Sequence, residues 1–241
     1  MTGSFAQLFR PVLQKRRGLA LALWGEAGVG KSHAVRDLLA SLPCRSLSLH
    51  ATTPLPSLAQ TLVHPLARPK KLASWAERAL ERSASGEAVE TPLLLGAFGA
   101  VLSGLAPFAL HLEDIHEADE ERSAFIRDLA ALAVRGKGAG LVATSRREPP
   151  EPFARFKLEP LSRQESDRLL EAELKANLPK DALAFVYARA AGNPLYTLEY
   201  VRYLTRQGFL WNDGHLWRWR KPLGDAMPAT VEALIEDLLS R

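Results

Sequence analysis

Residues 25–32 constrain the fold more than any other stretch of the chain. They read Gly-Glu-Ala-Gly-Val-Gly-Lys-Ser, which fits the pattern G-x-x-x-x-G-K-S. The glycines let backbone N–H groups turn inward around phosphate oxygens, and a helix that starts after the loop adds partial positive charge. Lys31 can reach the β- and γ-phosphates of a nucleotide, and the Ser32 hydroxyl can ligate Mg²⁺. We therefore predict a nucleotide-binding loop made of Gly25, Glu26, Ala27, Gly28, Val29, Gly30, Lys31, Ser32 and His33.

The segments that flank this loop have the pattern that such a loop requires. Leu19–Trp24 is a short uncharged apolar run, which is typical of a strand buried on both faces of a parallel sheet. After the loop, apolar residues recur at the spacing of one helix face, at Val35, Leu38, Leu39 and Leu42. The alternative, a glycine-rich turn that matches the motif by chance, does not account for the strand before it and the helix after it.

Up to residue 160 the chain alternates between strand and helix patterns. Further strands are predicted at 45–50, 108–112, 140–145 and 153–158, and helices at 1–18, 58–63, 70–83, 93–105 and 120–135. Such alternation favours an α/β fold, in which a parallel sheet is covered by helices on both faces. We therefore assign residues 1–160 to an α/β domain of the P-loop NTPase class.

The pattern becomes helical after residue 161. Ser162 and Glu165 stand at the spacing of a capping box, which starts a helix. More helices are predicted at 181–190 and 195–207, followed by a hairpin at 210–220 that turns at Asn212-Asp213-Gly214. The chain ends in an apolar helical stripe opened by a proline: Pro228, Val231, Leu234, Ile235, Leu238 and Leu239. We predict that residues 161–241 form a small helical lid with a β-hairpin and the start of a further helical region.

Composition excludes a disulfide-stabilised fold and favours a cytoplasmic protein. Cys44 is the single cysteine among 241 residues, so no intrachain disulfide can form. Residues 91–112 lack Asp, Glu, Lys and Arg over a length that could cross a bilayer. Pro92 and Pro107 bracket a helical piece, however, and the run then enters an acidic motif. We therefore expect a buried helix, a turn and a buried strand there, and no membrane contact.

A second chemical site is predicted where the strand at 108–112 ends. Two acids, Glu113 and Asp114, follow it directly. A carboxylate at a strand tip can hold Mg²⁺, which prefers oxygen ligands, and a second carboxylate can polarise the attacking water. We assign the metal to Glu113 together with Ser32, and the water to Asp114. The alternative is an acidic strand end whose charge only stabilises the start of the next helix.

The residues around these acids resemble a known family. Residues 112–119 read Leu-Glu-Asp-Ile-His-Glu-Ala-Asp, which is similar to the acidic motif of STAND-type signalling ATPases. These belong to the AAA/ASCE part of the P-loop class and include bacterial transcription regulators of the MalT and LuxR/SARP kind. The sequence departs from the usual motif at Glu113, Ile115 and Glu117, where the family more often has Asp, Leu and Trp.

Three later stretches resemble the same family. Residues 143–146 resemble its sensor segment, which implies that Arg146 contacts the γ-phosphate; Arg147 is the rival, and a surface arginine pair is the alternative. Residues 191–195 resemble its G-x-P motif, which implies that Pro194 lies near the nucleotide base, whereas the alternative is an ordinary turn between helices. Residues 208–239 resemble its hairpin, P-x-T segment and apolar helix, which lead into further domains.

Together these features predict an ATP- and Mg²⁺-dependent switch domain of a signalling or transcription-regulating protein. The catalytic residues would be Asp114, Glu113 and Arg146, and intrinsic turnover would be low. The resemblance implies further domains or protein partners at the C-terminal stripe, although the stripe could instead pack on the lid. One alternative is a DNA-handling AAA+ ATPase that uses the aromatic and basic hairpin residues Trp211, Trp217, Arg218, Trp219, Arg220 and Lys221. Another is a module that binds nucleotide without hydrolysing it.

Overall fold

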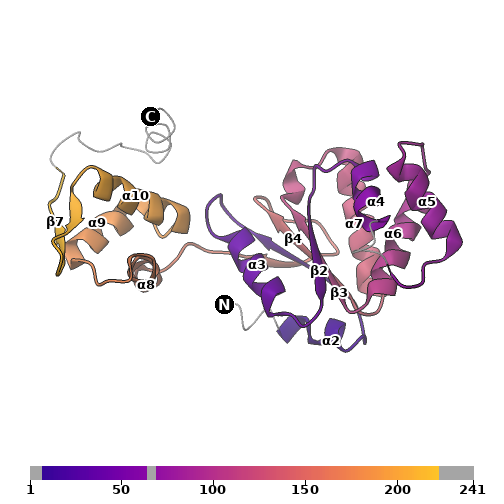
Figure 1. Cartoon of the computed structure of the whole chain (residues 1–241), viewed down its shortest axis with the longest axis horizontal. Coiled ribbons are helices and arrows are strands. Elements are labelled where there is room, and N and C mark those ends of the chain that lie inside the picture. The colour runs from indigo at the N-terminus through magenta and orange to yellow at the C-terminus, as the bar shows by residue number, and fades with distance from the viewer. Residues whose placement is uncertain (1–6, 64–68, 223–241) are drawn as a thin grey trace. The chain divides into compact units, whose positions relative to one another are not determined.

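A computed structural model describes residues 7–63 and 69–222 of the chain (Figure 1). Contacts divide these residues into two units. The first holds the residues up to Glu26 together with Lys31–Leu158, and the second holds Ala27–Gly30 together with the residues from Glu159 onward. The division cuts through the glycine-rich loop, so that its tip groups with the second unit.

The first unit is built on a parallel sheet of five strands in the order β2-β3-β4-β1-β5. The strands are β1 (Leu19–Trp24), β2 (Arg45–His50), β3 (Phe108–Glu113), β4 (Ala139–Ser145) and β5 (Ala154–Lys157). The three central strands are apolar along almost their whole length because side chains on both of their faces are buried. The prediction of an α/β fold with a parallel sheet is confirmed.

Helices cover the sheet and alternate with its strands. They are α2 (Arg10–Leu13), α3 (Lys31–Ser41), α4 (Leu55–Val63), α5 (Ser74–Ala84), α6 (Thr91–Leu105), the short 3₁₀ helix η1 (Ile115–Glu117) and α7 (Glu120–Arg135). Every second residue of the central strands joins one core with α4 to α7, where the rings of Phe98 and Phe125 meet edge to face with centroids 5.3 Å apart. Figure 1 shows α3 on one side of the strands and α4 to α7 on the other.

Helix boundaries depart from the sequence prediction in three places. Of the helix predicted at 1–18, the described part is the short α2, which ends before Lys15 adopts a left-handed φ of 54°. Residues 1–6 lie outside the described residues. Helix α4 begins at Leu55, three residues earlier than predicted, because Pro56 is tolerated in a first turn. Helix α5 begins at Ser74, four residues later than predicted.

The second unit is helical and ends in a hairpin. It contains α8 (Arg163–Leu174), α9 (Lys180–Ala190), α10 (Pro194–Arg206), β6 (Leu210–Asn212) and β7 (Trp217–Trp219). Ser162 and Glu165 form both hydrogen bonds of the predicted capping box at the start of α8. Its core packs large side chains from all three helices and the hairpin, among them Leu170, Val186, Tyr200, Leu204 and Leu210. The predicted apolar stripe after Pro228 lies outside the described residues.

The uncharged run at 91–112 divides between a helix and a strand. Helix α6 takes its first part and β3 its last part, and Leu94, Phe98 and Leu110 are buried in the core. Within the described ranges, no helix combines the length and the apolar character that crossing a membrane needs.

Gly18 allows α7 and β1 to come together, and we predict that Gly18→Ala destabilises the fold. Gly18 N–H donates to Gly136 O over 2.8 Å, and a Cβ at position 18 would stand 1.7 Å from Ala133 O. Because that neighbour is backbone, the chain must shift, which costs about 2 kcal/mol or more. Urea unfolding measures this change.

Gly96→Ala is the matched control. A Cβ there would meet nothing closer than the Trp75 ring at 3.4 Å, and alanine favours a helix interior. Equal unfolding midpoints for the two variants would show that the close approach of Gly18 to Ala133 does not require a glycine at position 18.

Candidate nucleotide-binding site

The three predicted site segments meet at one edge of the sheet. The glycine-rich loop follows β1, the acids end β3, and the arginines follow β4, and these three strands are neighbours. Hydrogen bonds tie their ends together: Gly25 N–H donates to Ser145 O over 3.2 Å, and Asp114 N–H donates to Thr144 Oγ1 over 3.0 Å. The carboxyl ends of parallel strands are where α/β proteins place their ligands.

The glycine-rich loop has the backbone that its motif requires. Gly25, Gly28 and Gly30 have φ values of 149°, 77° and 98°, which residues with a side chain rarely adopt. Among the described residues, no atom lies within 4 Å of the place where a Cβ of residue 30 would stand. The loop therefore leaves room beside its backbone that a phosphate oxygen can enter.

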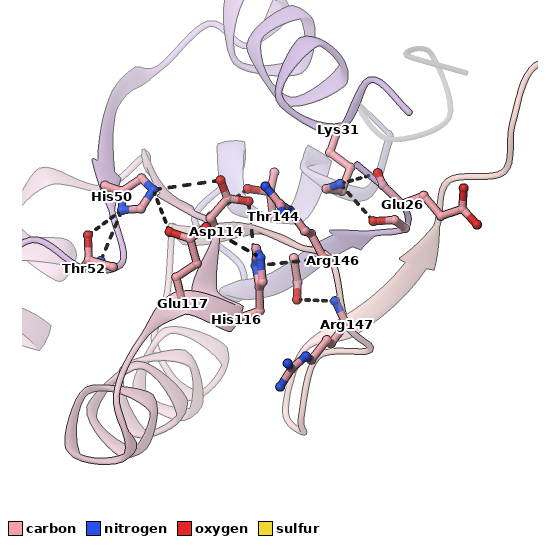
Figure 2. A network of polar contacts seen from close by, with 12 residues as sticks. Glu26, Lys31, His50, Thr52, Asp114, His116, Glu117, Thr144, Arg146 and Arg147 are labelled. Carbon is pink, nitrogen blue, oxygen red and sulfur yellow. Dashed lines mark hydrogen bonds and ion pairs between the residues drawn. The ribbon is translucent and has the colours of Figure 1, made fainter. Parts of the chain in front are cut away.

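Lys31 is buried inside this loop. Its side chain is 8% exposed, and its Nζ donates to Gly25 O over 2.9 Å and to Glu26 O over 2.7 Å (Figure 2). Burial lowers the pKa of Lys31, while the negative charge of Asp114 opposes that shift and the positive charge of Arg146 adds to it. The ammonium group bonds to loop carbonyls here, and those are the bonds that phosphate oxygens would replace.

Asp114 lies between two histidines. It has a left-handed backbone, with φ 51° and ψ 52°, at the turn between β3 and η1. His50 Nε2 lies 3.9 Å from its Oδ2 and 3.8 Å from Glu117 Oε2, and His116 Nδ1 lies 3.8 Å from its Oδ1 (Figure 2). The His50 ring is oriented by Thr52, whose Oγ1 is 2.8 Å from Nδ1. The carboxylate therefore has defined neighbours on both sides.

Neither histidine was predicted from the sequence as a neighbour of Asp114. His50 is the last residue of β2 and pairs in register with Glu113, so it could be found only once the two strands were known to be adjacent. His116 carried a local signal, because it stands two residues after Asp114 in the acidic motif.

Glu113 and Ser32 share one hollow of ≈ 290 Å³, which is also lined by Arg36, Ser46, Ser48 and His111. Glu113 Oε1 lies 3.8 Å from His111 Nδ1. Burial lowers the pKa of His111 to about 4, so the ring is neutral at pH 7. A hydroxyl and a carboxylate in one hollow fit the oxygen ligands that Mg²⁺ prefers.

The rest of a Mg²⁺ shell would have to come from phosphates and water. Within residues 7–63 and 69–222, no three His, Cys, Asp or Glu side chains gather closely enough to hold a metal ion by themselves. This agrees with the way Mg²⁺ is usually bound, through one or two protein ligands and several waters.

The two arginines differ in what they face. The positive charge of Arg146 helps to lower the pKa values of Lys31 and His116, so its guanidinium lies near both residues. Arg147 lines a separate hollow of ≈ 270 Å³ together with Pro149 and Pro150, and in Figure 2 its side chain points away from Asp114. This geometry favours Arg146 for the sensor role, which stays a prediction.

Asn193 is a further candidate that the sequence prediction did not single out. Within the second unit its Oδ1 caps α10 by accepting from the N–H groups of Leu195 and Tyr196, and its Nδ2 donates to Ala27 O over 2.8 Å. The side chain is 5% exposed. Pro194, predicted to lie near the base, is the first residue of α10, and that role stays a prediction.

Residues 2–142 match the family described as "AAA ATPase domain". The chain belongs to this AAA ATPase domain family. Sequence comparison with curated proteins gave no match. The prediction of an AAA-class ATPase domain is thus confirmed.

Solved structures place the AAA ATPase domain among P-loop proteins of several kinds. A Signal Transduction ATPase with Numerous Domains (STAND) protein with a tetratricopeptide repeat sensor from Pyrococcus horikoshii matches at 14% identity and TM-score 0.53, over 78% of this chain and 28% of that one. ORC1 of Aeropyrum pernix in complex with DNA matches at 16% identity and TM-score 0.59, over 99% of this chain and 64% of that one. AMPPCP-bound DnaA of Aquifex aeolicus matches at 13% identity and TM-score 0.50, over 86% of this chain and 61% of that one. At these identities the likeness shows the fold, and the chain spans less than two thirds of each of these proteins.

We predict that Lys31→Ala abolishes tight nucleotide binding by the AAA ATPase domain. The variant removes the ammonium group that the loop holds, and loss of its charge-assisted hydrogen bonds weakens affinity about tenfold or more. Isothermal titration with ADP and a slowly hydrolysed ATP analogue measures this. Lys137→Ala, an exposed lysine in the turn between α7 and β4, should bind like the wild type. Near-wild-type affinity of Lys31→Ala would contradict the loop assignment.

Proposed function

We propose that this chain is an ATP-binding and ATP-hydrolysing switch module within a longer signalling or transcription-regulating protein. In this proposal residues 1–160 form the ATPase domain and residues 161–241 form the lid. The observation that carries it is the position of Asp114 directly after β3, where its N–H bonds to Thr144 of the neighbouring strand at the same sheet edge as the buried Lys31. A lysine for the phosphates and a carboxylate for the water are the two parts that separate hydrolysis from simple binding.

The proposed chemistry assigns one task to each side chain. Lys31 leaves the carbonyls of Gly25 and Glu26 to bind the β- and γ-phosphates. Ser32 and Glu113 would hold Mg²⁺, which when bound would neutralise negative charge on the phosphates. Asp114 orients the attacking water and accepts its proton. Arg146 stabilises the charge that builds up on the γ-phosphate oxygens during transfer.

The switch assignment is supported by the contacts of the loop tip. Ala27–Gly30 groups with the second unit, and Asn193 donates to the carbonyl of Ala27. The backbone that would bind phosphate therefore also bonds to the residue that caps α10. The STAND protein among the structural neighbours is named for signal transduction, and we propose that role for this chain.

Substitution of Asp114 tests hydrolysis separately from binding. We predict that Asp114→Asn keeps the affinity for ATP and lowers turnover about 100-fold or more, because the amide cannot accept a proton. Steady-state phosphate release, measured at several Mg²⁺ concentrations, is the assay. Glu113→Gln should also raise the Mg²⁺ concentration needed for half-maximal rate, and Asp128→Asn, on the exposed face of α7, is the control.

Two outcomes would contradict the proposed hydrolysis. Unchanged turnover in Asp114→Asn would remove that residue from the mechanism. A wild type that binds ATP and releases no phosphate would favour the nucleotide-binding module without turnover.

A second candidate function, DNA handling, is favoured by a groove in the second unit. Its volume is ≈ 580 Å³, and its lining residues are Asp181, Ala184, Phe185, Ala188, Arg189, Trp219 and Lys221. The Arg189 guanidinium lies 3.7 Å from the centroid of the Phe185 ring, which in turn packs against Trp219 at 5.0 Å. Aromatic rings beside cations are what single-stranded nucleic acid needs for base stacking and phosphate contact. ORC1, one of the structural neighbours, was solved with DNA.

Salt dependence distinguishes this candidate from the switch. DNA handling predicts that a labelled single-stranded oligonucleotide binds, with log affinity falling linearly as log salt rises. Arg189→Ala/Lys221→Ala should weaken binding and flatten that slope by about two phosphate contacts. Arg202→Ala, an arginine paired with Glu199 and Glu173 on the same unit, should leave the slope unchanged. Absence of salt-dependent binding by the wild type would leave the switch as the function.

A further inference from the structure

His116 bridges two segments of the proposed catalytic site. It belongs to η1, directly after Asp114, and its Nδ1 accepts a hydrogen bond from the backbone N–H of Arg146 over 3.3 Å (Figure 2). The two residues are 30 positions apart in the sequence. The His116 side chain is 10% exposed, whereas Arg146 lies at the surface.

The bond fixes the protonation state of the ring. A nitrogen that accepts from a backbone N–H carries no proton, so the proton of a neutral ring must be on Nε2, which lies 3.9 Å from Glu117 Oε1. Burial lowers the pKa of His116, with Arg146 and Lys31 adding to that shift and Asp114 and Glu117 opposing it. Nδ1 is therefore available as an acceptor at neutral pH.

The backbone at this point lies just beyond the sheet. Strand β4 ends at Ser145, and the next two N–H groups bond to side chains: that of Arg146 to His116, and that of Arg147 to Ser145 Oγ over 3.1 Å. The direction of the chain after β4 is thus set by these two side chains. Because Arg146 and Arg147 are consecutive, that direction decides which guanidinium faces the loop and which lines the hollow beside Pro149.

We propose that His116 is a positioning residue that orients Arg146 toward the γ-phosphate by holding its backbone N–H. This inference rests on the proposed function of Arg146 and adds to it a cause for the choice between the two arginines. It also gives the histidine of the acidic motif a role in the loop after β4. A ring that only filled space would need its shape and no acceptor at Nδ1.

Two variants separate the acceptor from the shape. His116→Asn keeps an oxygen acceptor near the place of Nδ1, whereas His116→Phe keeps a flat ring and removes the acceptor. The hollow of ≈ 270 Å³ that His116 also lines leaves room for the larger ring. Thermal unfolding of both variants checks that each is folded.

The first readout needs no nucleotide. Amide hydrogen exchange at Arg146, measured by NMR, should be slow in the wild type and in His116→Asn, and about tenfold or more faster in His116→Phe. The ¹⁵N shifts of the wild-type ring should show a proton on Nε2 and none on Nδ1. Wild-type exchange at Arg146 in His116→Phe would overturn the proposal.

The second readout connects the bond to catalysis. His116→Phe should lower kcat about 10- to 100-fold, because a displaced arginine no longer meets the transferring phosphate, and should leave ADP affinity unchanged. His116→Asn should keep most of the wild-type kcat. Adding Arg146→Ala to His116→Phe should cost nothing further, since one residue acts through the other. If the reductions in kcat caused by His116→Phe and Arg146→Ala multiplied in the double variant, the proposal would be overturned.

Failure of the proposed function gives a different result. If the wild type binds nucleotide without turnover, the hydrolysis proposal fails, and the ratio of affinities for a slowly hydrolysed ATP analogue and ADP replaces kcat. His116→Phe should then lower that ratio as much as Arg146→Ala does. An unchanged ratio would overturn the role of His116.

Discussion

Parallel pairing of β1, β4 and β3 is the constraint on which the site depends. Leu23 pairs with Thr144, and Leu112 pairs with Ala143, so the three strands end within a residue or two of one another. A lysine, a carboxylate and an arginine from segments far apart in the sequence therefore meet at one edge. The hydrogen bond from Asp114 N–H to Thr144 Oγ1 fixes this alignment beyond the last sheet pairing, at a threonine that is fully buried.

Charged side chains of both signs gather at this edge beside two histidines, His111 and His116, whose pKa values are lowered. The charge of Asp114 opposes the lowering of the Lys31 pKa, while burial lowers the pKa values of His111 and His116. Neutral rings can accept hydrogen bonds as well as donate them, which charged rings cannot. Lys31 already bonds to the carbonyls of Gly25 and Glu26, so binding of a triphosphate would exchange those partners for phosphate oxygens.

Local sequence patterns predicted the helices and strands well, but they did not predict contacts between residues far apart in the sequence. The motif at 25–32, the acids after β3 and the capping box at Ser162 are each encoded within a few residues, so spacing and apolar pattern were enough to find them. The neighbours of Asp114 depend on strand order, which periodicity cannot give, and so His50 was missed. The predicted boundaries of α2 and α5 were wrong because the apolar spacing extends beyond the helix itself. Lys15, in a left-handed conformation, follows the end of α2, and a loop precedes the start of α5 at Ser74.

Asn193 shows how one loop can serve two contacts at once. In a trans peptide the N–H and C=O groups point in opposite directions, so a loop whose N–H groups turn toward a phosphate turns carbonyls the other way. The carbonyl of Ala27 accepts from Asn193, and that of Gly28 accepts from Leu195 N–H over 3.3 Å. A Cβ at position 28 would stand 2.7 Å from Asn193 Oδ1, so glycine there is required by the contact with Asn193 as well as by the positive φ. Hydrogen bonds on the two sides of one peptide polarise each other, so a phosphate on the amide side would act on the same peptide that Asn193 holds at its carbonyl.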